Sequence, residues 1–118
     1  LMFGVSKKLL SAIIEHETGG KWDPTLIGPT GDVGLGQHNP MTTVAQIKKL
    51  IGEYDPNNPD DAIRGTAAYL KWLSERPGLK TEDDVIKAYN LGPSGAVDPE
   101  KQKTAEKYLK KVRDVERS

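Results

Sequence analysis

Apolar residues recur at helical spacing in five stretches of the chain, which are separated by segments rich in Gly, Pro and Asp. The first stretch covers residues 7–18, and its apolar positions fall in one arc about 140° wide when successive residues are placed about 100° apart. These positions are Leu9, Leu10, Ile13 and Ile14. Ser6 is a suitable N-cap, and Gly19 and Gly20 favour termination of the helix. The pattern therefore predicts an amphipathic helix.

Two acids in this helix have different expected environments. Glu17 projects near the middle of the apolar arc, whereas Glu15 points almost the opposite way. We expect Glu15 to be an ordinary solvated residue and Glu17 to face the core or a cleft. Burial and the negative end of the helix dipole both favour the protonated form of Glu17. A carboxylic acid that keeps its proton near neutral pH can act as a general acid.

Four further helices are predicted, over residues 43–51, 60–75, 81–89 and 99–115. Their expected N-terminal signals are a capping box of Thr43 and Gln46, a cap at Asp60 or Asp61, a capping box of Thr81 and Asp84, and Asp98 followed by Pro99. Residues 19–40 form a long loop rich in Gly and Pro, and loops of this length inside compact domains are uncommon unless they are functional. The prediction is an all-α fold forming a single domain over residues 1–118.

Composition narrows the possible partners. Lys and Arg total 17, as do Asp and Glu, so no broad basic face for nucleic acid is expected. No apolar run approaches the roughly 18 residues of a membrane span, and no signal-peptide pattern is visible in this segment. Cys is absent, and His16 and His38 lack metal-ligand spacing, so neither a metal site nor a cofactor is expected, and both His are assigned to packing or to the surface.

Three short motifs stand apart from the helical pattern. They are Glu17 with Thr18 at the first helix end, GDVGLGQ at residues 31–37, and AYNLGP at residues 88–93. In this order and spacing they resemble the soluble lytic transglycosylase (SLT) domain, a lysozyme-like family acting on bacterial peptidoglycan. Members have a helix ending in Glu-Ser, a loop with Gly-x-x-Gly-Leu-Met-Gln, and a later Ala-Tyr-Asn-Ala-Gly-Pro. The similarity runs from about Leu9 to Pro93.

The resemblance implies a lytic transglycosylase that cleaves the β-1,4 bond between N-acetylmuramic acid and N-acetylglucosamine and forms a 1,6-anhydro-muramoyl product. It assigns Glu17 as the catalytic acid/base and requires no cofactor. The positions that match the substrate-contacting motifs are Thr18, Gly34, Leu35, Gln37, Tyr89 and Asn90. It also implies peptidoglycan glycan strands as the partner, a monomer, and a location in the cell envelope, whether periplasm or cell wall, or in a phage particle.

The chain departs from the family pattern at several positions. Gly36 replaces the usual Met, Leu91 replaces a small Ala, and Thr66 and Ala62 stand where Gly and Asn are common. These departures bear on substrate contacts rather than on the acid.

Two alternative functions remain open. A goose-type muramidase shares the fold and the Glu but hydrolyses the bond with a water positioned by loop carboxylates, for which the candidates here are Asp23 and Asp32. Both acids have the sequence context of turn residues. The other alternative is a weakly active peptidoglycan-binding module of a cell-wall or phage assembly. Trp22 in the same loop is expected to pin the loop to the body, or to offer an apolar wall to a ligand.

Overall fold

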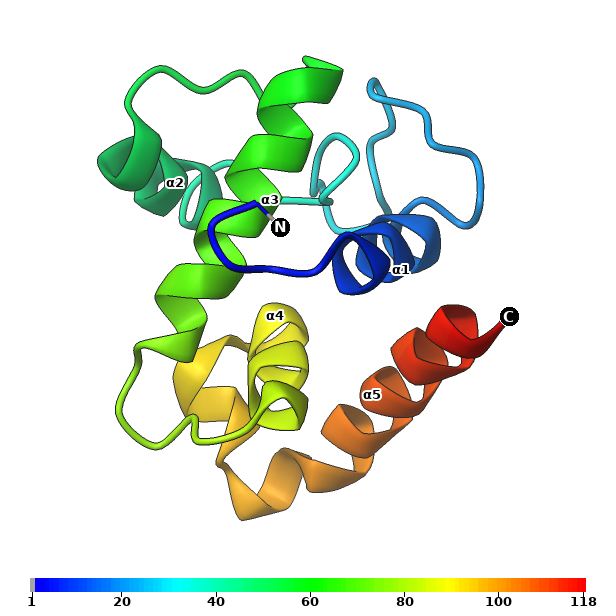
Figure 1. Ribbon diagram of the computed structural model, residues 1–118, viewed down its shortest axis with the longest axis vertical. Coiled ribbons are helices and arrows are strands. Elements are labelled where there is room, and N and C mark those ends of the chain that lie inside the picture. The colour runs from blue at the N-terminus through cyan, green and yellow to red at the C-terminus, as the bar shows by residue number, and fades with distance from the viewer. Residues whose placement is uncertain (1) are drawn as a thin grey trace. The chain divides into compact units, whose positions relative to one another are not determined.

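The computed structural model describes residues 2–118, and its regular secondary structure is helical, with a long loop between the first two helices (Figure 1). The helices in this range are α1 (Lys7–Glu17), α2 (Thr43–Ile51), α3 (Pro59–Ser74), α4 (Glu82–Ala96) and α5 (Gln102–Arg117), with a 3₁₀-helix, η1 (Pro99–Lys101), before α5. Pairing of extended backbone within residues 2–118 is limited to isolated β-bridges. The all-α class is therefore confirmed.

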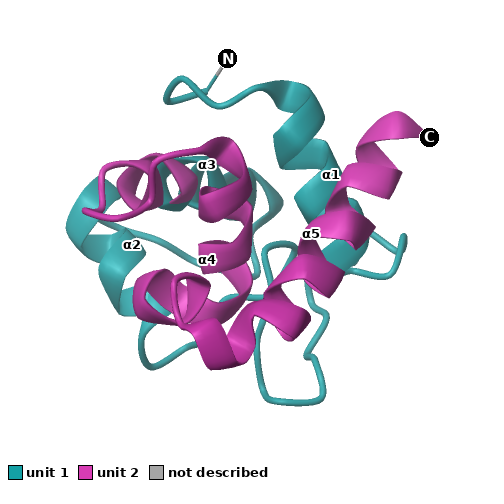
Figure 2. Cartoon of the chain, turned by 90° about the horizontal axis from the view of Figure 1, so that it is seen from below, with its two compact units in different colours: residues 1–69 teal, residues 70–118 magenta. Residues whose placement is uncertain are grey.

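The chain divides into two compact units, residues 1–69 and residues 70–118 (Figure 2). The division falls inside α3, so that this helix contributes residues 59–69 to the first unit and residues 70–74 to the second. The expectation that residues 1–118 form one domain stays a prediction.

The apolar arc of α1 lies in the core, as the sequence predicts. Leu9, Leu10, Ile13 and Ile14 are each at most 5% exposed. Burying a Leu or Ile side chain contributes roughly 1.5–3 kcal/mol, so the arc makes α1 a firm support for the loop that follows it. Ser6 caps the helix as expected, since its Oγ accepts the N–H of Leu9 at 3.1 Å.

The start of α4 also follows the sequence pattern. The hydroxyl of Thr81 accepts the Asp84 N–H at 3.2 Å, and Oδ2 of Asp84 accepts the Thr81 N–H at 3.2 Å, which completes the predicted capping box.

Two other predicted caps are wrong. At α2, Thr43 and Gln46 form no capping box; Oδ1 of Asn39 instead accepts the N–H groups of Met41 at 2.8 Å and Thr42 at 3.1 Å. The Asn39 side chain can accept hydrogen bonds from the turn that leads into α2. The hydrogen-bonded structure at this end of α2 therefore begins earlier in the chain than the predicted capping box at Thr43.

At α3 the cap is Asn58 rather than Asp60 or Asp61. Oδ1 of Asn58 accepts the Asp61 N–H at 3.0 Å, and Pro59 occupies the first turn, where its missing N–H costs nothing. Asp61 is used differently, because its Oδ2 accepts the N–H of Asp55 at 2.9 Å.

In the second unit, α4 extends beyond its expected end at Tyr89. Gly92 takes a non-helical conformation (φ 78°, ψ 166°), which kinks the helix, and the chain then continues helically to Ala96. Pro93 explains both features, because proline cannot continue the preceding turn yet fits the first turn of a new one. The predicted abrupt stop is therefore a kink.

Within this unit, charged pairs join α5 to α4. Nη1 of Arg113 lies 2.8 Å from Oε1 of Glu82, and its Nη2 lies 2.6 Å from Oδ1 of Asp83. Nζ of Lys87 lies 2.8 Å from Oε1 of Glu106. The acids are largely exposed, so each pair contributes at most about 1 kcal/mol and mainly fixes how the two helices align.

No helix in the described part of the chain combines the length and the apolar character that a bilayer crossing requires.

Candidate functional site

The site predicted from the sequence begins where α1 ends, at Glu17. The next residue, Thr18, is 2% exposed, and its hydroxyl donates to the Ile14 carbonyl at 2.8 Å and accepts the N–H of Trp22 at 3.1 Å. Gly19 and Gly20 follow with positive φ values of 61° and 82°, a conformation that favours glycine. The half-buried Glu17 thus lies at a helix end whose last turn is joined by the Thr18 hydroxyl to the loop at Trp22.

Glu15 is not the plain solvated residue that the sequence predicts. It is half-buried, and its Oε1 accepts the indole N–H of Trp22 at 3.1 Å. The helical wheel places Glu15 away from the arc but cannot show that the loop folds back over this face. Trp22, which has a positive φ of 50°, therefore pins the loop to α1, the first of the two roles expected for it.

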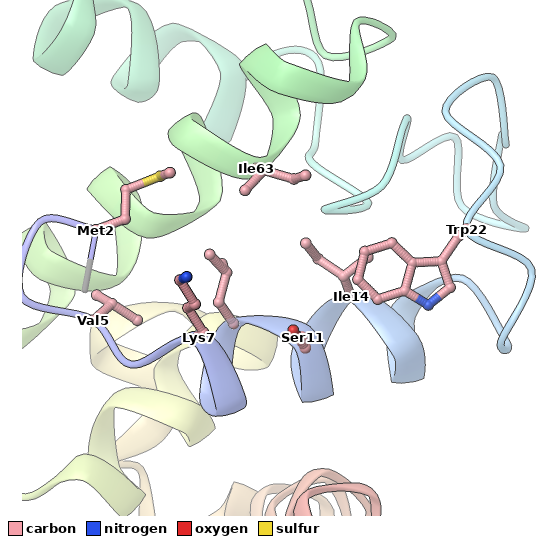
Figure 3. Close-up of a pocket in the computed structure, with 8 residues that line it drawn as sticks. Met2, Val5, Lys7, Ser11, Ile14, Trp22 and Ile63 are labelled. Atoms are coloured by element: carbon pink, nitrogen blue, oxygen red, sulfur yellow. The ribbon is translucent and has the colours of Figure 1, made fainter.

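The side chain of Trp22 also lines an apolar pocket of about 270 Å³ in the first unit (Figure 3). The α1 residues of this pocket, Lys7, Leu10, Ser11 and Ile14, lie on the helical stripe that reaches Glu17 and Thr18 in the next turn. Ile63 lies across the pocket from α1, and Met2 and Val5 lie at the end of the pocket away from Trp22 (Figure 3). Trp22 thus borders a pocket while it pins the loop, and its second expected role, as an apolar wall for a ligand, stays a prediction.

The loop that carries GDVGLGQ is organised by its own backbone and by Gln37. The N–H of Gly34 donates to the Leu26 carbonyl at 2.9 Å, and Val33 and His38 exchange both backbone bonds at 3.0 Å. Nε2 of Gln37 donates to the carbonyls of Gly34 at 2.9 Å and Leu26 at 3.2 Å. Both amide hydrogens of Gln37 are therefore used inside the loop, which leaves Oε1 as the atom able to accept from a ligand hydroxyl.

One glycine in this loop is required by a close contact with backbone, and a second lies against the end of the Gln37 side chain. A Cβ on Gly34 would lie 1.9 Å from the Pro56 carbonyl oxygen, and the residue has a φ of 77°. A Cβ on Gly28 would lie 2.2 Å from Oε1 of Gln37. Gly34 is buried, and its neighbour Leu35 is 3% exposed. These two predicted site residues therefore lie inside the loop and contribute to its packing.

The two loop acids are engaged in turns, as the sequence indicates. Oδ1 of Asp23 accepts the hydroxyl of Thr25 at 2.7 Å and its N–H at 2.9 Å, and these bonds hold the pKa of Asp23 below its usual value. Oδ2 of Asp32 accepts the Thr30 hydroxyl at 3.1 Å.

Comparison with known proteins decides the family. The family described as the transglycosylase SLT domain matches residues 1–112 of the chain. The chain belongs to this family. The resemblance drawn from the three motifs is thereby confirmed.

Curated relatives of this SLT domain include membrane-bound lytic murein transglycosylase F of Yersinia enterocolitica, which is 32% identical over 99 residues, covering 80% of the chain and 19% of that protein. Endo-type membrane-bound lytic murein transglycosylase A of Klebsiella pneumoniae is 32% identical over 93 residues, covering 74% of the chain and 45% of that protein. The chain thus spans less than half the length of either relative.

The remaining predicted residues of the SLT domain, Tyr89 and Asn90, lie on α4 in the second unit, three and two residues before the kink at Gly92. Tyr89 is half-buried and Asn90 is exposed. Their approach to Glu17, and the contact of all six matched positions with a glycan, stay predictions.

Sequence reasoning missed a buried polar cluster of the SLT domain. His38 is 2% exposed, which confirms the packing role expected for it, but it also bonds to Tyr54 and Thr66. Tyr54 and Thr66 lie 16 and 28 residues further along the chain, so no local spacing announces the cluster. A signal in the sequence was the departure at Gly36, which replaces the usual Met of the family. Within residues 2–118, no group of three or more His, Cys, Asp or Glu is placed to hold a metal ion.

Proposed function

We propose that the chain is the catalytic domain of a peptidoglycan lytic transglycosylase, with Glu17 as its acid/base. The match of the SLT family over residues 1–112 carries this proposal. The structure adds support, because Glu17 ends a helix whose apolar arc is buried and which is joined by Thr18 and Trp22 to the loop containing Gln37.

In the proposed reaction, the protonated carboxyl group of Glu17 donates its proton to the glycosidic oxygen as the bond from C1 of N-acetylmuramic acid to that oxygen breaks. The 6-hydroxyl of the same sugar attacks C1, and its proton passes to the Glu17 carboxylate. The leaving sugar gains one proton, the carboxyl group is restored, and the product carries a 1,6-anhydro bond.

This reaction needs one carboxyl group, whereas hydrolysis by a glycosidase uses two. The loop acids that could supply a second one, Asp23 and Asp32, accept hydrogen bonds from Thr25 and Thr30 in their own turns. Their engagement in turns favours the transglycosylase over the goose-type muramidase.

We further propose that Tyr89 and Asn90 line the glycan groove with Gln37, and that Thr18, Gly34 and Leu35 hold its floor. A monomer acting on glycan strands in the cell envelope fits this arrangement. The relatives' printed names describe membrane-bound murein enzymes, which supports an envelope location; a phage particle that attacks the same wall is the other setting we propose.

Digestion of purified sacculi followed by mass spectrometry tests the function. We expect muropeptides with anhydro-muramoyl ends, and products with reducing ends alone would show a muramidase instead. Binding to sacculi without any cleavage would show a peptidoglycan-binding module.

The Glu17→Gln variant tests the acid. It keeps the side-chain shape but removes the transferable proton, so we expect turnover to fall by about 10²–10⁴-fold. Glu15→Gln is the matched control, because it changes an acid on the same helix while keeping an acceptor for the Trp22 indole. Wall clearing that survives Glu17→Gln would contradict the proposal.

A further inference from the structure

The side chains of His38, Tyr54 and Thr66, which lie far apart in the sequence, meet in the first unit. Nδ1 of His38 lies 2.5 Å from the hydroxyl of Tyr54, and its Nε2 lies 3.2 Å from the hydroxyl of Thr66 on α3. The exposed fractions are 2% for His38, 6% for Tyr54 and 0% for Thr66. A hydrogen-bonded cluster at this depth holds its members firmly, since losing one partner leaves another buried and unsatisfied.

The direction of each bond follows from the Thr66 hydroxyl. It has one hydrogen, which it donates to the Ala62 carbonyl at 2.7 Å, so it can only accept from His38. Nε2 of His38 must therefore carry a hydrogen. In the neutral imidazole Nδ1 is then an acceptor, and the Tyr54 hydroxyl donates to it. The bonds form one directed chain, from Tyr54 through His38 and Thr66 to Ala62.

The cluster also explains why residue 36 is a glycine. A Cβ on Gly36 would lie 2.3 Å from Nε2 and 2.5 Å from Cε1 of His38, and 2.6 Å from Oγ1 of Thr66. Gly36 does not have a left-handed φ, so space rather than backbone conformation requires the glycine. The loop therefore packs its main chain directly on the imidazole.

A second glycine, Gly65, leaves room for the Tyr54 ring at the other end of the cluster. A Cβ on Gly65 of α3 would lie 2.4 Å from Cε1 of Tyr54, so the phenol ring rests on bare helix backbone. The His38 ring also faces Tyr69, with ring centroids 6.4 Å apart in an edge-to-face arrangement. The imidazole is thus fixed between α3 and the segment containing Tyr54.

We propose that His38 is a positioning residue for the glycan-contacting loop: as a neutral imidazole with its hydrogen on Nε2, it locks the backbone of residues 34–38 onto α3. The lock sets the place of the adjoining Gln37, which has a positive φ of 49°. The lock also requires a glycine at residue 36 as long as His38 and Thr66 occupy their present positions. The inference that this loop meets a glycan rests on the proposed function; the lock itself does not.

Hydrogen exchange tests the lock without reference to activity. The Tyr54→Phe variant removes one donor and keeps the ring, so we expect protection of the Gln37 and His38 amides to fall by about tenfold or more. Amides in α5 should keep their protection. Tyr108→Phe is the matched control, because it removes a buried tyrosine hydroxyl from the second unit. Unchanged protection at residues 37 and 38, or an equal fall in α5, would overturn the proposal.

Kinetics with labelled sacculi test the consequence for substrate. Gly36→Ala should displace the imidazole and raise KM by about tenfold, with kcat little changed because the acid is untouched. His38→Asn removes the ring on which the loop packs, and should also raise KM by about tenfold with kcat little changed. A KM that neither variant raises would count against the lock. If the unaltered protein releases no product, the proposed function fails, and the exchange experiment alone decides the lock.

Discussion

Burial of His38 makes the stability of this domain depend on pH in a defined window. The imidazole is 2% exposed, and desolvation lowers its pKa from 6.5 to about 4. In the unfolded chain the ring returns to a value near 6.5. Between these two values the unfolded state binds a proton that the folded state does not, so the free energy of unfolding decreases as the pH falls.

The size of the effect follows from the shift. Each pKa unit corresponds to about 1.4 kcal/mol, so a shift of about 2.5 units, from 6.5 to about 4, costs about 3 kcal/mol in total. The stabilisation is complete above pH 6.5, decreases steadily below it, and is lost by about pH 4. About 3 kcal/mol is a large part of the 5–15 kcal/mol that typically holds a domain folded.

Urea unfolding at steps between pH 7.5 and pH 4 measures this loss. The comparison is with His38→Asn, which has no titrating ring; its lower stability at pH 7 does not matter, because only the dependence on pH is compared. Asp23, Asp84 and Asp114, whose pKa values lie below 3.8, lose their contributions at lower pH and do so in both proteins.

Nuclear magnetic resonance gives an independent check on the same residue. The chain has two His, so the His38 signals can be assigned by their absence from the variant. We expect its ring to stay neutral down to about pH 5 with the hydrogen on Nε2. A midpoint near 6.5, a hydrogen on Nδ1 in the neutral ring, or equal pH dependence in both proteins would refute the reasoning.

Two further predictions concern the loop and the helices. Gly34→Ala places a methyl group 1.9 Å from the Pro56 carbonyl oxygen at a positive φ, so we expect a loss of more than about 3 kcal/mol in urea unfolding, whereas Gly31→Ala, with φ 87° but open space, should lose only about 1 kcal/mol. Equal losses would show that the contact with Pro56 is not rigid. Asp84→Ala removes one half of the Thr81 capping box and should lower stability by about 1 kcal/mol, measured as a fall in melting temperature; an unchanged melting temperature would contradict the cap.

Local sequence signals were reliable where a single segment decides the outcome. The arc of α1 and the caps at Ser6 and Thr81 depend on residues within one or two helical turns, and all three formed as predicted. The caps of α2 and α3 were misplaced because Asn39 and Asn58 order the chain ahead of the helices, where several polar residues compete for the same role.

The sequence by itself determined the helical class, the family, and the place of Glu17 on α1, because periodicity and motif spacing are local properties of the chain. The tertiary structure decided what Glu15 binds and what surrounds His38. Trp22 reaches Glu15 only because the loop folds back, and His38 meets Tyr54 and Thr66 only because the loop packs on α3. Such contacts join residues far apart in the chain, so the periodicity of the sequence does not predict them.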